Sequence, residues 1–200
     1  KIFSPGRVAA IAANTFRDLV RQKVFYFMLL FALILIGMSL GLASISFQGQ
    51  LQTVMDVSLG AMSVFTMLLA VLATAMLLPK DMEDRTLYTI LAKPVSRFEY
   101  LAGKLAGVTV MLLVATLLMA TAFCVVLHFW QGREIEIVQL NEPPERAAAA
   151  IQAIKSGTFT ATLFGGIGVI FLRAIVCAAL TLMVSCFATS WLFTVITALM

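Results

Sequence analysis

The chain of 200 residues is 62% hydrophobic and only 12% charged, and its mean hydropathy is +1.02. Soluble domains carry about 25% charged residues, so this composition excludes the ordinary soluble classes and indicates a membrane protein. The net charge is a modest +4, and its distribution along the chain is more informative than its size.

The first element expected is an amphipathic helix over residues 4–22. Ser4 suits the N-cap and Pro5 suits the first helical position. Apolar side chains follow at helical spacing, with basic and polar ones mainly on the other side. Because this basic helix precedes an apolar run, we expect it to lie in the membrane interface.

Four membrane spans are expected at residues 24–46, 54–79, 105–130 and 158–187, and a fifth is expected to start within 191–200. Each complete run exceeds the ~20 apolar residues that a span needs. The chain lacks an initial methionine and stops inside an apolar run, so we expect a piece of a longer protein with a further span. The predicted fold class is therefore an all-α, polytopic helical bundle forming one transmembrane domain over residues 1–200.

The segment between the second and third spans is unusually polar. We call Lys80–Lys104 the charged segment, because nine of its residues are charged. Glu83–Leu91 is expected to form a short helix, which Lys93-Pro94 ends, since proline lacks an N–H and restricts the residue before it. Ser96–Glu99 has the pattern of a capping box that opens the next helix. A short helix, followed by a proline stop and a capped start of the next helix, suits a docking surface better than a flexible loop does.

The distribution of lysine and arginine predicts the orientation. Residues 1–23 carry five of them and the charged segment carries five, whereas residues 47–53 carry none. Residues 131–157 carry three, against four glutamates. We therefore expect the N-terminus and the charged segment on the cytoplasmic side, and residues 131–157 outside as a loop.

Polar residues inside the predicted spans are few. Arg173 lies near the middle of the fourth apolar run, where a charge is costly and usually faces a cavity or a partner. Asp56 lies in the first turn of the second span, and the two could form an intramembrane polar site. If Arg173 instead marks a boundary, the run would divide into two shorter segments, an alternative that the sequence leaves open.

No chemistry of catalysis or metal binding stands out. The chain has no P-loop and one histidine, His128, which shares a helix face with Cys124. We interpret this pair as a packed cysteine and an interfacial histidine. All three cysteines, Cys124, Cys177 and Cys186, lie in apolar runs and are interpreted as buried hydrophobic residues outside any disulfide. We expect no metal and no cofactor on this chain.

Two glycine pairs permit close helix approach. Gly37 and Gly41 lie in the first span, and Gly103 and Gly107 lie at the start of the third. Packing within the chain and packing between two copies explain these pairs equally well.

Residues 83–104, EDRTLYTILAKPVSRFEYLAGK, resemble the cytoplasmic loop of ABC-2-type transporter permeases. The shared pattern is an acidic pair, a Thr-Leu, two apolar positions, Lys-Pro-Val-Ser-Arg, an aromatic residue and Gly-Lys. The N-terminal stretch IAANTFRDLVRQKVFY is similar to the family's elbow helix, and the order of spans matches over the whole chain. Within the family, the chain looks closest to permeases linked with multicopper-enzyme maturation or with gliding-type exporters.

This resemblance implies a permease subunit with six spans that couples ATP hydrolysis to transport, with export as the expected direction. It implies a dimer, homomeric or heteromeric, in the cell inner membrane with two separate ATPase subunits, on which ATP and Mg²⁺ are bound. The docking residues would lie in a coupling helix of the charged segment: Glu83, Asp84, Arg85, Thr86, Leu87, Leu91, Pro94 and Arg97. A long 131–157 segment departs from many relatives and is a candidate site for a partner outside the membrane. No nucleic-acid partner is expected.

Two other functions compete with this one. A non-transporting anchor or mechanotransmitting subunit would share the docking helix but lack a polar path through the membrane. An intramembrane hydrolase would need clustered His, Glu or Asp, and the predicted spans hold only isolated candidates.

Overall fold

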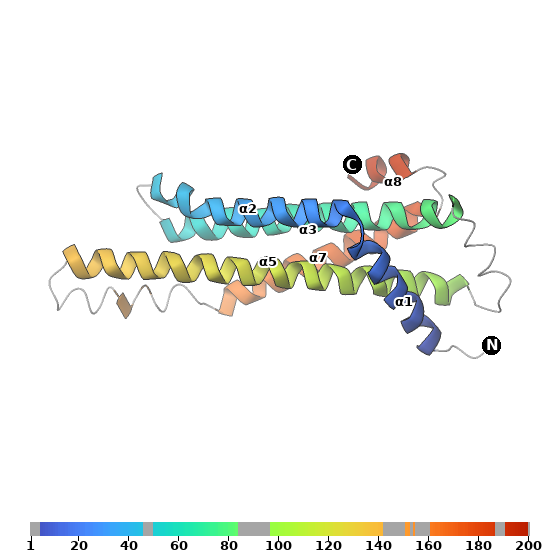
Figure 1. Cartoon of the computed structure of the whole chain (residues 1–200), viewed down its shortest axis with the longest axis horizontal. Coiled ribbons are helices and arrows are strands. Elements are labelled where there is room, and N and C mark those ends of the chain that lie inside the picture. The colour runs from blue at the N-terminus through green and yellow to red at the C-terminus, as the bar shows by residue number, and fades with distance from the viewer. Residues whose placement is uncertain are drawn as a thin grey trace. The chain divides into compact units, whose positions relative to one another are not determined.

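The computed structural model describes residues 5–45, 50–83, 97–141, 151–152, 154, 161–186 and 191–199. The described residues form helices and no strand (Figure 1). The helices are α1 (Pro5–Val20), α2 (Lys23–Ile45), α3 (Gln50–Glu83), α5 (Arg97–Asn141), α7 (Ala161–Ser185) and α8 (Trp191–Leu199). The all-helical, polytopic fold class predicted from the sequence is therefore confirmed.

Four of these helices are long and apolar enough to cross a membrane. The candidate spans cover Lys23–Gly41, Leu51–Leu77, Phe98–Leu140 and Thr162–Ser185. They lie in the four long apolar runs of the sequence. The fourth is one continuous helix, so Arg173 lies inside a span and does not divide it.

The chain divides into two compact units, and the long helices contribute to both. The first unit comprises Lys1–Met28, Phe65–Ala115 and Phe171–Met200, and the second comprises Leu29–Val64 and Thr116–Ile170. The first unit contains the N-terminal helix and the described residues of the charged segment, and it is the unit of greatest functional interest.

The first unit packs α1 against the start of α5 (Figure 1). Leu19 of α1 is 1% exposed, and Leu112 of α5 is fully buried. The corner from α1 to α2 is tight: the N–H groups of Arg21, Gln22 and Phe25 donate to backbone carbonyls three or four residues earlier, each at 3.1 Å. These bonds fix the direction in which α2 leaves α1.

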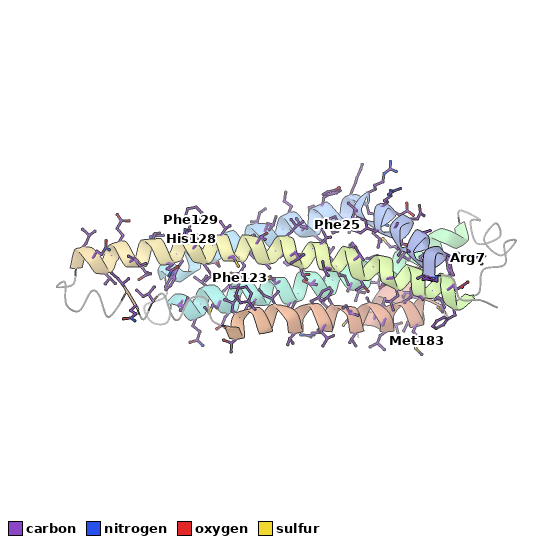
Figure 2. All side chains as sticks on the ribbon, turned by 90° about the horizontal axis from the view of Figure 1, so that it is seen from below. Arg7, Phe25, Phe123, His128, Phe129 and Met183 are labelled. Carbon is purple, nitrogen blue, oxygen red and sulfur yellow. The ribbon has the colours of Figure 1, made fainter. Side chains whose placement is uncertain are left out.

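The second unit contains a polar contact between two spans. The Ser58 hydroxyl of α3 donates to the Ser39 oxygen of α2 at 3.2 Å, and Ser39 donates to the carbonyl of Ile36 at 2.6 Å. Both serines are buried, so each hydroxyl finds a partner inside the protein, as apolar surroundings require. Phe123 of α5, also fully buried, lies on the side of its helix away from Phe129 (Figure 2).

Helix α5 is longer than the sequence analysis expected. It has 45 residues, about 67 Å at 1.5 Å per residue, and it continues through residues 131–141 without a break. The polar composition of residues 131–157 predicts a loop, whereas residues 131–141 are helical. A fall in hydropathy marks the end of an apolar surface, but good helix formers such as Glu134 and Glu136 continue the helix. Between Asn141 and residue 157 the structure describes only Ile151, Gln152 and Ile154, which are helical.

Helix α3 continues past Pro79 and ends at Glu83. The sequence predicts that the second span ends at this proline. A proline inside a helix removes one backbone hydrogen bond and crowds the carbonyl four residues earlier. Despite this cost, α3 continues for about one turn beyond its apolar residues, to Glu83.

Candidate functional site

The charged segment contains two helical ends that the structure describes. Glu83 is the last residue of α3, and Arg97 is the first residue of α5. Glu99 is then the third residue of α5, as expected for the glutamate of a capping box. Ser96 and six predicted docking residues lie outside the described residues: Asp84, Arg85, Thr86, Leu87, Leu91 and Pro94.

The first turns of α5 bury two charged side chains. Glu99 is 4% exposed and Lys104 is 6% exposed, and both interact with other groups of the protein. The Lys104 ammonium lies 5.6 Å from the centre of the Tyr100 ring, within the range of a cation–π contact. Buried charges are retained only where they have partners, so this end of α5 holds a defined polar arrangement.

An apolar cluster joins three helices at the same level. Tyr100 of α5 and Leu182 of α7 are buried together, and Ile11 of α1 packs against them with Leu101 and Leu105. All five residues belong to the first unit. The beginning of α5 is thus held by α1 on one side and by α7 on another.

We call the contact of Ile11, Ala12 and Thr15 with Gly103 and Gly107 the α1–α5 junction. A Cβ atom added at Gly103 would lie 2.8 Å from Cβ and Cγ2 of Ile11. One added at Gly107 would lie 2.7 Å from the Ala12 carbonyl oxygen and 2.7 Å from Cβ of Thr15. Both glycines are therefore needed for the close approach of the two helices.

The junction answers, for one of the two glycine pairs, the question that the sequence left open. Gly103 and Gly107 serve packing within the chain, whereas a Cβ at Gly37 or Gly41 would meet nothing within 4 Å. The sequence showed the spacing but not its partner, because α1 reads as a solvated or interfacial helix. The burial of Glu99 and Lys104 was not predicted either, because both belong to the charged segment and their own sequence context gives no sign of it.

Arg173 lies at the centre of α7. Twelve helical residues precede it within the helix and twelve follow, so either end is ~18 Å away, beyond the reach of an arginine side chain. Its side chain is exposed, as are its neighbours Leu172 (61%) and Val176 (52%). The guanidinium of Arg173 therefore lies among exposed apolar side chains at the middle of α7.

Asp56 is also exposed, in the first turns of α3. It belongs to the second unit, whereas Arg173 belongs to the first. Each is described as a polar group on its own span helix, and their pairing stays a prediction.

The cysteines and the histidine depart in part from expectation. The three cysteines are free; Cys186 is exposed, so its predicted burial is wrong, and the other two are half-buried. His128 is exposed and lies with Phe129 on the outer side of α5 (Figure 2). Within the described part of the chain, no three His, Cys, Asp or Glu side chains come close enough to hold a metal ion.

The comparison with protein families is decisive for the identity of the chain. A family profile described as "ABC-2 family transporter protein" matches residues 9–195, which covers the described spans and both flanks of the charged segment. No curated protein matches the chain. Four apolar span helices and this match make it a multi-pass membrane protein, a transport component of the permease type. The chain belongs to the ABC-2 family of transporter proteins.

Proposed function

We propose that this chain is the permease subunit of an ABC exporter and that it couples ATP hydrolysis on separate ATPase subunits to movement of a substrate across the membrane. The observation that carries the proposal is the family match over residues 9–195. The absence of a P-loop from the sequence agrees with a nucleotide site on another chain. We expect ATP and Mg²⁺ to bind there and no cofactor on this chain.

The charged segment is proposed as the docking element. Its helix would enter a cleft of the ATPase through Glu83, Leu87 and their neighbours. Support comes from its position in the chain, because the segment includes the end of one span helix, at Glu83, and the start of the next, at Arg97. A displacement of the segment would act on the ends of α3 and α5 together.

The packing at the start of α5 supports transmission of that displacement. The α1–α5 junction and the cluster of Tyr100 with Leu182 tie α5 to α1 and α7. Close-packed contacts of this kind move as a body rather than deforming one side chain at a time. A force received at Arg97 would therefore reach three helices of the first unit.

The assembly and its orientation follow from the same proposal. Two permease chains, identical or different, would work with two ATPase subunits in the inner membrane. The N-terminus and the charged segment would face the cytoplasm, in agreement with their excess of lysine and arginine. Residues 131–157 would then lie outside and remain a candidate contact for a further partner. Arg173 and Asp56 are the proposed polar positions in the membrane.

One observation favours a second function, that of a mechanotransmitting subunit which moves no substrate. Helix α5 runs unbroken from Arg97 to Asn141 and so extends beyond its apolar part. A helix of this kind could deliver motion from the ATPase to a partner outside the membrane. Docking would be the same in both functions, and only transport would differ.

The test is a double variant, Glu83→Ala with Leu87→Ala, in the complete complex. We expect the ATPase subunit to be lost on co-purification, or to hydrolyse ATP without transport, while the permease still inserts. Arg133→Ala, which removes an exposed charge of α5 outside the charged segment, is the control. Normal co-purification with normal coupling in the double variant would remove the charged segment as the docking element. If the ATPase subunit hydrolyses ATP in the native complex but the complex transports no substrate, the second function, mechanotransmission, is favoured.

A further inference from the structure

The corner between α1 and α2 carries three exposed cations. We call Arg17, Arg21 and Lys23 the basic corner; all three side chains are exposed. The Arg21 N–H donates to the Arg17 carbonyl at 3.1 Å, so the two arginines lie one helical turn apart. Asp18 is the acid nearest in sequence, and its carboxylate accepts a hydrogen bond from the Asn14 amide at 3.2 Å. The corner retains a net positive charge.

The packing of α1 determines where these cations face. Thr15 and Leu19 are buried, and Thr15 contacts the position of Gly107 on α5. At ~100° per residue, Arg17 lies about 160° around α1 from both Thr15 and Leu19. Arg17 is therefore on the side of α1 opposite to its protein contact, and Arg21 follows directly after the helix, bonded through its N–H to the Arg17 carbonyl.

An exposed apolar surface begins directly beside the cations. Lys23 is the first residue of the first candidate span. Tyr26 is 56% exposed and Phe27 is 66% exposed, three and four residues after Lys23 and hence on its face of α2. Tyr26 is held by edge-to-face contact with the buried Phe25 ring, with centroids 5.5 Å apart. Cationic groups at a span end, followed by exposed aromatic rings, match an anionic head group followed by an acyl chain.

We propose that the basic corner is a binding site for the phosphate of an anionic phospholipid, with its acyl chain along Tyr26 and Phe27. Arginine binds phosphate through paired N–H donors, and lysine adds a point charge. The backbone bonds of the corner and the α1–α5 junction hold the cations in place before the lipid arrives. The site depends on neither an ATPase partner nor transport.

The experiment is a titration of the full chain, in neutral detergent micelles, with phosphatidylglycerol or with phosphatidylcholine, read by native mass spectrometry. We expect tighter binding of phosphatidylglycerol. Each neutralised cation should weaken that preference by about five-fold, so Arg17→Gln with Arg21→Gln should weaken it by on the order of twenty-five-fold. Arg17→Lys with Arg21→Lys should keep most of it. Arg133→Gln, at an exposed arginine outside the corner, should leave it unchanged.

Three results would overturn the proposal. The first is equal binding of the two lipids by the native chain. The second is an equal loss in Arg133→Gln, which would indicate a non-specific effect of net charge. The third is displacement of phosphatidylglycerol by millimolar inorganic phosphate, which would assign the corner to a free anion and not to a lipid. The thermal midpoint in phosphatidylcholine alone, expected to be unchanged, shows that the variants are folded.

Discussion

Replacing Gly107 by alanine should separate α1 from α5. The new Cβ would lie 2.7 Å from the Ala12 carbonyl oxygen and from Cβ of Thr15, where ordinary contacts are 3.4–4 Å. Neither atom is the end of a flexible side chain, so α1 as a whole must move by roughly 0.7 Å or more, the difference between the two distances. Overpacking of this kind costs about 1–3 kcal/mol.

Alanine also has the better helix propensity, by about 1 kcal/mol, and a control is needed to separate the two effects. Gly132→Ala lies on the same helix, where a Cβ meets nothing within 4 Å. It should gain the propensity term alone, so the difference between the two variants isolates the clash at about 1–3 kcal/mol. At ~2–4 °C per kcal/mol for a chain of this size, Gly107→Ala should melt several degrees below Gly132→Ala. If both variants melt at the same temperature, the α1–α5 junction does not exist in the folded protein.

Three further predictions concern the spans and their orientation. Arg173→Leu should insert and fold normally but reduce transport or the signal across the membrane; a fully active and more stable variant would show that Arg173 faces lipid and costs ~2.5–3.5 kcal/mol there. Ser58→Ala should lower stability by about 0.6–2 kcal/mol, because it removes the hydrogen bond to Ser39 across two spans, and an unchanged thermal midpoint would count against that bond. In a cysteine-free background, a cysteine at Glu142 should react with an impermeant reagent from outside the cell and one at Asp84 only after permeabilisation; the reverse labelling would invert the proposed topology.

The sequence predicted the elements of this fold that depend on one helix at a time. The lengths of the apolar runs located the spans, and the capping-box pattern of Ser96–Glu99 located the start of α5. The structure has Arg173 near the centre of one continuous helix, which agrees with its place near the middle of the fourth apolar run and not with the boundary alternative. These features depend on the free energy of placing the backbone and the charged groups of a single helix in an apolar environment, which the nearby sequence determines.

Features that depend on two helices were not predicted. The spacing of Gly103 and Gly107 indicated a close approach, but only the folded chain shows that α1 is the partner. The same holds for Glu99 and Lys104, whose burial results from neighbouring elements and not from their own sequence context. The extension of α5 was missed for another reason: the end of an apolar surface does not end a helix.

The length of α5 also makes bilayer thickness a variable for this protein. Leu105–Gly132 is free of Asp, Glu, Lys and Arg and measures ~42 Å along the helix, against a hydrocarbon core of ~30 Å. This hydrophobic mismatch must be absorbed by tilt of the helix or by local thickening of the bilayer. Because Gly103 and Gly107 fasten α1 to the same helix, a change of tilt would rotate the N-terminal helix as well. Acyl-chain length could thus change the angle at which the chain presents its polar end to another protein.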